Sequence, residues 1–331
     1  MRFSRGSFLG ISCLLALTFI FAASSASAEA DKPDFYRLRM GDMEIVALSD
    51  GHTFLSQSLF RGISAQEMRL FLEQASQPAD GDIRTAVNAY LVRMGDRLIL
   101  VDAGAAACFG SSLGQIRGNL EAAGYLPEAV DTVLLTHLHA DHVCGLTDRA
   151  GAAVFPNATL WTAEEEADYW LSEEKAAPAS EGMRAAFEMA RAAVKPYAVN
   201  GRLKTFARGQ ELFPGVTSVS SAGHTPGHSG YLFASRGQNL LIWGDIVHNG
   251  AVQFARPDVS IAFDSDSAQA VTTRKKIFEQ AARERFLVTG AHLPFPGVGY
   301  VRRTPEGGYQ WFPILSDQEF PGGENAAEDA K

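Results

Sequence analysis

The sequence has little positive charge, few cysteines and no long apolar run, and these shortages narrow the classes of protein that it can encode. It carries 29 lysine and arginine residues against 38 aspartate and glutamate residues, a formal net charge of −9. An acidic chain without a basic run is a poor candidate for binding nucleic acid or an anionic membrane surface. It also has no low-complexity linker and no detectable repeat, so we expect one large α/β domain.

Cysteine is scarce as well, with only three in the chain. Cys13 lies in an N-terminal apolar stretch, while Cys108 and Cys144 each lie near a segment that we predict to be an active-site loop. In an oxidising compartment the latter two could form a disulfide. Because sequence alone gives no connectivity, two separate buried thiols are the alternative.

The first residues are typical of an export signal. Arg2 and Arg5 form a basic start, Ile11–Ala23 is an apolar core, and Ala26–Ala28 is a small-residue cleavage site. The apolar core is too short to span a bilayer as a helix. We therefore predict a signal peptide over residues 1–28 and a periplasmic or secreted protein with no membrane contact after cleavage. An uncleaved membrane anchor is the alternative.

The rest of the chain alternates short apolar runs with helical patterns over residues 29–320, and residues 321–331 form a polar tail. Helix starts are predicted at the capping box Ser64–Glu67, at Thr162, and after Asp264–Asp266. The strand-like runs end just before polar side chains that can carry chemistry. Because α/β layers present active residues where strands end, we expect these side chains to form the functional site.

The segment Thr136–His142 places three histidines and one aspartate close together, directly after an apolar run. His137 and His139 are two residues apart, so on an extended backbone they leave the same face. Asp141 and His142 are adjacent and need a turn to converge on a second point. The four side chains cannot all reach one ion without strain, but they can be divided between two. Imidazole and carboxylate suit zinc, and also iron, cobalt or manganese; a solvated histidine-rich turn is the alternative.

Further candidate ligands follow later strand-like runs, and the complete set is His137, His139, Asp141, His142, His224, Asp245 and His292. The motifs Val101–Ala106, Gly223–His228 and Ala291–Gly297 accompany them. Together these features resemble the metallo-β-lactamase superfamily, and within it the methyl parathion hydrolases, over essentially the whole chain after the signal segment. The resemblance implies an α/β fold, an αββα sandwich in a single domain, with a metal centre at one edge.

The resemblance also implies how the ligands are divided between two divalent metal ions, with zinc as the expected metal. One ion would be held by His137, His139 and His224, the other by Asp141, His142 and His292, and Asp245 would bridge both. A hydroxide that bridges two metal ions is the nucleophile in such centres. Asp141 and Asp245 are the predicted catalytic residues, because Asp245 would fix the spacing of the two ions and Asp141 would help to receive a proton.

Two further residues receive roles from the resemblance. Asp102 would orient a ligand imidazole through its outer nitrogen, and an ordinary turn or cap aspartate is the alternative. His228 lies in a ligand motif but is left off the metal as a structural histidine.

Aromatic and bulky side chains are predicted to line the substrate pocket: Phe109, Trp170, Phe187, His248, Ile261 and Phe263. The first three resemble pocket aromatics of methyl parathion hydrolase, with ordinary core packing as the alternative. His248 stands where the organophosphate hydrolases have leucine, and a buried, hydrogen-bonded histidine is its alternative. Ile261 and Phe263 look bulkier than their counterparts, so a narrower pocket should favour a planar carbonyl over a tetrahedral phosphotriester.

We therefore predict an exported, dinuclear metal-dependent hydrolase that acts on a small-molecule lactone or aryl ester. An organophosphate triester hydrolase and an acyl-homoserine lactonase are the enzymatic alternatives. A metal-binding protein without catalysis is the alternative from another class. The resemblance further suggests a homodimer.

Overall fold

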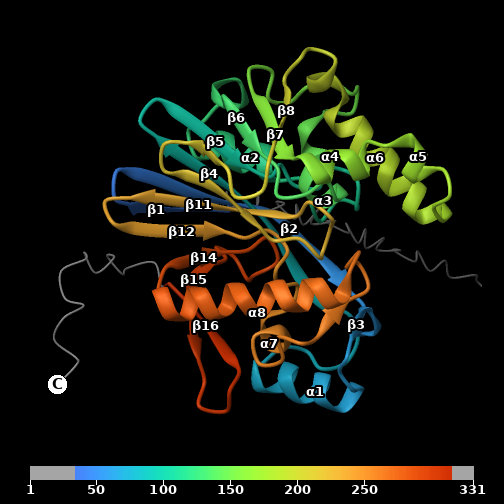
Figure 1. Cartoon of the computed structure of the whole chain (residues 1–331), viewed down its shortest axis with the longest axis vertical. Coiled ribbons are helices and arrows are strands. Elements are labelled where there is room, and N and C mark those ends of the chain that lie inside the picture. Colours follow the sequence, from blue (N-terminus) through green and yellow to red (C-terminus); the bar gives the residue numbers. More distant parts are fainter. Residues whose placement is uncertain (1–33, 315–331) are drawn as a thin grey trace, which may run out of the picture. The chain divides into compact units, whose positions relative to one another are not determined.

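Two sheets of seven strands each pack face to face at the centre of the structure, a computed structural model that describes residues 34–314 (Figure 1). The first sheet has the order β1-β2-β4-β5-β6-β7-β8 and comprises Phe35–Met40 (β1), Met43–Leu55 (β2), Ile83–Met94 (β4), Arg97–Val101 (β5), Thr132–Leu134 (β6), Thr159–Ala163 (β7) and Leu203–Phe206 (β8). The second has the order β16-β15-β14-β12-β11-β10-β9 and comprises Glu211–Phe213 (β9), Val216–Ser220 (β10), Ser229–Ser235 (β11), Gln238–Ile242 (β12), Leu287–Thr289 (β14), Val298–Arg303 (β15) and Tyr309–Pro313 (β16). A small sheet pairs Phe60–Arg61 (β3) with Ser260–Ile261 (β13).

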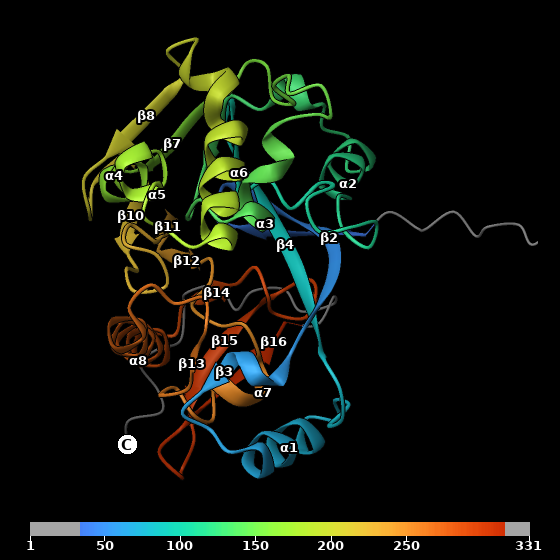
Figure 2. The same ribbon diagram turned by 90° about the vertical axis from the view of Figure 1, so that its right-hand side faces the viewer.

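Helices cover the outer faces of both large sheets. They are Ala65–Gln74 (α1), Ile116–Ala122 (α2), Ala140–Val143 (α3), Glu164–Trp170 (α4), Glu173–Ala176 (α5), Glu181–Ala198 (α6), Gly250–Gln253 (α7) and Ser267–Glu284 (α8), with short 3-10 helices at Gln57–Leu59 (η1), Pro127–Ala129 (η2) and Cys144–Leu146 (η3). The helices α2, α4 and α6 pack on the first sheet, and α8 packs on the second (Figure 1). Figure 2 shows α1 beside α7, near the small sheet.

Alternate residues of a central strand enter different apolar cores. In β5, Leu98 and Leu100 pack under the helices of the first sheet, whereas Ile99 and Val101 pack between the two sheets. Successive side chains of a strand point to opposite faces, so a strand with two covered faces must be apolar throughout. This explains the continuous apolar runs of the sequence and confirms the predicted αββα sandwich.

The helix starts were only partly predictable. Ser64 and Glu67 form the predicted capping box, since the Ser64 hydroxyl accepts from the Glu67 amide and the Glu67 carboxylate accepts from the Ser64 amide. Asp266 caps α8 by accepting from the amide of Gln269. The cap predicted at Thr162 is wrong, because Thr162 is a buried residue of β7 that pairs with β8, and α4 has no side-chain cap.

All described residues fall in a single compact unit. The predicted signal peptide at 1–28, with Cys13, and the predicted polar tail at 321–331 lie outside the described residues. Between residues 34 and 314, no helix is both long and apolar enough to cross a bilayer. Cys108 and Cys144 form a disulfide, so the paired alternative holds.

Candidate metal centre

The candidate ligands come together from loops that follow β6, β10, β12 and β14. They form two groups that share one aspartate, and in each group the ligand atoms lie within 4.8 Å of one another. The histidine cluster consists of His137, His139 and His224 with Asp245. The mixed cluster consists of Asp141, His142 and His292 with Asp245.

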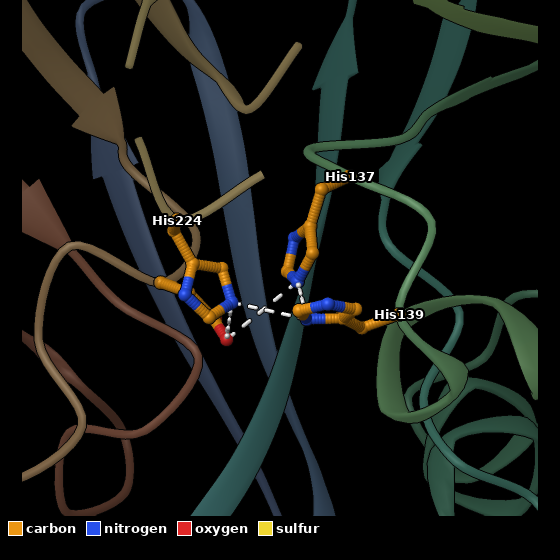
Figure 3. Close-up of side chains that lie close together, drawn as sticks. His137, His139 and His224 are labelled. Atoms are coloured by element: carbon orange, nitrogen blue, oxygen red, sulfur yellow. Dashed lines mark hydrogen bonds and ion pairs between the residues drawn. The ribbon is translucent and has the colours of Figure 1, made fainter. Parts of the chain in front are cut away.

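In the histidine cluster, ring nitrogens of three imidazoles point at a common place (Figure 3). The Nδ1 atom of His139 lies 3.0 Å from Nε2 of His137 and 3.0 Å from Nε2 of His224. The histidines of this cluster come from two loops that are far apart in sequence, so only the folded chain assembles it.

Hydrogen bonds on the outer side of two rings fix which nitrogen faces inward. Nδ1 of His224 donates to Asp264 at 2.9 Å, and Nδ1 of His137 donates to the hydroxyl of Thr136 at 3.0 Å. The inward Nε2 atoms of both rings therefore present lone pairs. Lone pairs this close repel each other unless a proton or a metal ion lies among them. Three imidazoles and a carboxylate are a donor set that fits zinc.

The rings of His137 and His139 resist protonation, so a proton does not readily take the place of a metal ion there. Burial, reinforced by the neighbouring imidazoles, lowers the pKa of His137 and of His139 well below 6.5. At His224, burial also acts to lower the pKa, but the hydrogen-bonded carboxylates of Asp245 and Asp264 outweigh it and raise the pKa to about 9.

The mixed cluster places two imidazoles against two carboxylates. Nε2 of His142 lies 3.1 Å from Oδ1 of Asp245 and 3.6 Å from Oδ2 of Asp141. Nε2 of His292 lies 3.0 Å from Oδ2 of Asp245 and 3.4 Å from Oδ2 of Asp141. His142 Nε2 and Asp245 Oδ1 are buried without a hydrogen-bond partner. Buried polar atoms are rarely left so, and a cation bound here would satisfy both.

Asp245 lies between the clusters. Its Oδ2 atom is 3.4 Å from Nε2 of His224 and 3.7 Å from Nε2 of His137, while its Oδ1 atom faces His142. Oδ2 also lies 3.0 Å from Nε2 of His292, so the carboxylate contacts both clusters, as a bridging role would require.

Asp102 makes the contacts expected of an orienting residue and not those of a turn or cap aspartate. It accepts from Nδ1 of His142 at 2.8 Å, which orients a ring of the mixed cluster. It also accepts from the backbone amide and the hydroxyl of Thr136, each at 2.8 Å. Its own φ is +61°, a conformation rarely adopted by residues other than glycine and commonly found at functional sites.

His228 lies outside both clusters, as predicted. Its Nδ1 donates to the carbonyl of Ser221 at 3.0 Å, and its Nε2 accepts from the amide of Asp245 at 3.1 Å. Burial lowers its pKa to about 3. A neutral His228 therefore holds the backbone of Asp245 in place.

Two supporting carboxylates were missed by the sequence analysis. Asp264 orients His224, but its position before a helix indicated only a cap, a role that Asp266 has instead. Glu166 is fully buried in α4 and accepts from Leu138 and Thr225, beside the ligand histidines. Its one sequence signal is that it shares a helix face with Trp170, four residues later.

The predicted pocket residues divide into buried and exposed ones. Trp170 and Phe187 are part of the core under the helices of the first sheet, with ring centroids 4.9 Å apart. Ile261 is buried in the core near the small sheet. For the two aromatics the structure therefore supports the core-packing alternative, although the Trp170 ring also meets His139 edge-on at 5.2 Å. Phe109 is 50% exposed.

His248 lies at the edge of the centre itself. Its Nε2 is 3.3 Å from Oδ2 of Asp245, and its ring stacks on His292 at 5.1 Å. Burial lowers its pKa to about 4, so the ring is neutral at pH 7. Phe263, which is 44% exposed, lies 6.4 Å from it, centroid to centroid. Of the predicted pocket residues, His248 and Trp170 have rings beside candidate ligands, and Phe263 lies next to His248.

Known proteins share this architecture. Residues 82–292 match the profile of the family described as "Metallo-beta-lactamase superfamily". The solved structure of "hydrolase AbOPH in beta lactamase superfamily" is 41% identical, with a TM-score of 0.82 over 86% of this chain and 98% of that one. The structure of AidC, "a Dizinc Quorum-Quenching Lactonase" with a bound product, is 26% identical, with a TM-score of 0.78 over 85% of this chain and 98% of that one. The uncharacterized protein YobT of Bacillus subtilis (strain 168) is 27% identical over 184 residues, which are 52% of this chain and 69% of that protein.

Proposed function

The chain belongs to the metallo-β-lactamase superfamily and is a metal-dependent hydrolase of that fold, and from this premise we propose that it hydrolyses lactones or aryl esters at a centre of two divalent metal ions. The expected metal is zinc, as in the dizinc lactonase to which the chain is similar. The observation that carries the proposal is the position of Asp245, whose carboxylate lies within 3.7 Å of ligand nitrogens from both clusters.

The residues of the two clusters would hold the ions, and each cluster has the donors that zinc prefers. Two divalent ions at this centre would supply a Lewis acid for the substrate oxygen and a site at which the pKa of water is lowered. Asp245 keeps the two halves of the centre at a fixed separation.

The protein contributes orientation and proton transfer. Asp264, Thr136 and Asp102 hold ligand rings with their lone pairs turned inward. The side chain of Asp141 is 21% exposed, whereas that of Asp245 is buried. Asp141 is therefore the carboxylate of the centre that a substrate can approach, and we assign it the proton that is released when water attacks.

The surroundings of the centre support a flat, carbonyl-containing substrate. His248 lies against Asp245 and His292 at the metal centre, with Phe263 beside it, and we expect these two side chains to leave little room for a tetrahedral phosphorus group. A neutral His248 can donate one hydrogen bond to an ester or lactone oxygen.

The substrate class is tested by a two-substrate assay on zinc-supplemented protein. We expect a higher kcat/KM for dihydrocoumarin, an aryl lactone, than for methyl parathion, a phosphotriester. Treatment with a chelator should abolish both activities. The opposite ranking of the two substrates would overturn the proposed substrate class, and elemental analysis that finds at most one ion per molecule would overturn the dinuclear centre.

Hydrolysis of acyl-homoserine lactones is a second candidate function. The similar AidC is a quorum-quenching lactonase whose structure holds an N-hexanoyl-L-homoserine product. A series of homoserine lactones with different acyl chains tests this candidate. A strong preference for one chain length would favour it over general lactone hydrolysis, whereas equal rates would count against it.

We also propose that the protein is exported. The disulfide between Cys108 and Cys144 supports this, because disulfides form and persist in oxidising compartments. Fractionation of cells that express the full chain should find a shortened protein outside the cytoplasm. A homodimer is proposed from the family resemblance, and sedimentation analysis tests it.

A further inference from the structure

Glu166 is a buried acid whose hydrogen bonds all come from the loops of the metal centre. It lies in α4 and is fully buried. Charged carboxylates are rarely buried unless they are paired. The groups that hydrogen-bond to the Glu166 carboxylate therefore call for a functional explanation.

Three donors converge on the carboxylate. Oε1 accepts from the amide of Leu138 at 2.9 Å, and Oε2 accepts from the hydroxyl of Thr225 at 2.7 Å and from the amide of Gly227 at 2.9 Å. Both oxygens accept, and backbone amides can only donate. This pattern suits the ionised carboxylate and not a carboxamide, whose NH2 group would face a donor.

The donors belong to the two loops that carry the histidine cluster. Leu138 stands between His137 and His139, and Thr225 directly follows His224. One side chain thus fastens both loops to the same helix. The same helix also presents Trp170 to the ring of His139.

Gly227 is an independent sign that this contact shapes the loop. A Cβ atom at this position would lie 2.2 Å from the backbone nitrogen of Glu166. Only glycine lets the second loop approach the start of α4 so closely. The glycine at position 227 therefore allows the short distance between its amide and the Glu166 carboxylate.

The mixed cluster is connected to Glu166 at fewer points. Asp141 and His142 follow Leu138 in the same loop, but His292 lies on another loop, and the loop of His224 carries no residue of the mixed cluster. The outer sides of the His142 and His292 rings are held by Asp102 and by the carbonyl of Ala86. A change at Glu166 should therefore act more strongly on the histidine cluster.

From these contacts we propose that Glu166 is a positioning residue that sets the relative placement of the two histidine loops, and thereby the metal affinity of the histidine cluster. The proposal rests on the proposed dinuclear function. It predicts a selective effect, since a side chain that only stabilised the fold would affect both clusters alike.

The test measures zinc affinity in two backgrounds, by titration against a chromophoric chelator. Asp141→Asn weakens the mixed cluster and leaves the histidine cluster as the tight site. His139→Ala leaves the mixed cluster. In the first background Glu166→Gln should raise the Kd for zinc by about 10–100-fold, the usual cost of losing a partner around a metal site. In the second it should raise the Kd by a clearly smaller factor.

Glu165→Gln is the matched control. Glu165 is the neighbouring residue of α4, its side chain is 40% exposed, and it pairs with Arg208 at 2.7 Å. The same chemical change there should alter neither Kd. An equal effect of Glu166→Gln in both backgrounds, or no effect in the first, would overturn the proposal.

Thr225→Val provides a second variant if Glu166→Gln does not fold, as judged by circular dichroism. It removes one of the three donors at nearly constant volume and should weaken the histidine cluster alone, by a smaller factor. An unchanged Kd for this variant would overturn the proposal. If the unaltered protein binds fewer than two zinc ions, the dinuclear function fails instead, which is a distinguishable result.

Discussion

The two halves of the metal centre differ in their ligands and in the groups that support them. The histidine cluster has three imidazoles on two loops, backed by the carboxylates of Asp264 and Glu166. The mixed cluster adds Asp141, which is partly exposed and lies on the four-residue helix α3. Each cluster has one partly exposed ligand, His139 in the histidine cluster and Asp141 in the mixed cluster, but only the second is a carboxylate that can exchange protons. We therefore expect the histidine cluster to bind its metal more tightly and the mixed cluster to take part in proton transfer.

Loss of the shared aspartate should have the largest effect, because Asp245 belongs to both halves of the centre. In Asp245→Asn both clusters lose a charged ligand, so we expect less than one bound zinc per molecule by elemental analysis. Activity should fall by more than about a hundredfold, since losses of even outer partners reach that range. Retention of two ions would show that the halves do not depend on a common bridge.

Asp141→Asn should have the next largest effect and separate the halves. The fold and the zinc of the histidine cluster should remain, while the mixed cluster binds its ion more weakly and kcat falls by about 10–100-fold. Zinc content and kcat are measured on the same preparation. Unchanged zinc content together with an unchanged rate would refute the assignment of Asp141.

The outer carboxylates sharpen the comparison further. Asp264→Asn should weaken zinc binding to the histidine cluster, and Asp102→Asn should weaken binding to the mixed cluster, each by about tenfold, because each loses the group that orients one ring. Competition titrations in the two backgrounds described above separate the constants. An effect of either variant on the wrong cluster would contradict the division of ligands.

Glu44→Gln should have the smallest effect on the centre and serves as a stability control. Burial acts to raise the pKa of Glu44, but hydrogen bonds from Tyr125, Arg37 and Arg93 outweigh it and lower the pKa from 4.5 to about 2. A lowered pKa means that Glu44 stabilises the folded state fully above about pH 4.5 and loses this contribution as the pH falls towards 2.

The variant should therefore lower the free energy of unfolding at pH 7 by about 1–3 kcal/mol, with a smaller difference at pH 3. Urea unfolding at both pH values measures this. Both zinc affinities should stay the same, which would show that moderate destabilisation alone does not distinguish the clusters.

The sequence was sufficient for the ligand set because the ligands follow recognisable strand ends. His137, His139 and His142 form a local motif, and apolar runs such as Leu98–Val101 indicate strands with two covered faces. Local patterns of this kind are set by neighbours in the chain. The orienting role of Asp102 came from the resemblance to the family, not from a local pattern.

The supporting residues could not be predicted in this way. Asp264 and Glu166 each have an ordinary local explanation, as a cap or as a helical acid. Only contacts across long sequence separations, such as Thr225 with Glu166, show their function. The lining of the pocket was equally hard to predict, since Trp170 and Phe187 could line a cavity or fill a core. Packing between α4 and α6 places both side chains in the core.

By itself, the sequence determined the layers, the strand ends and the side chains able to bind metal, because periodicity and local motifs encode them. The tertiary structure alone decided how those side chains are divided, oriented and exposed. These properties depend on distances between loops that are remote in the chain, and such distances exist only after the two sheets have packed together.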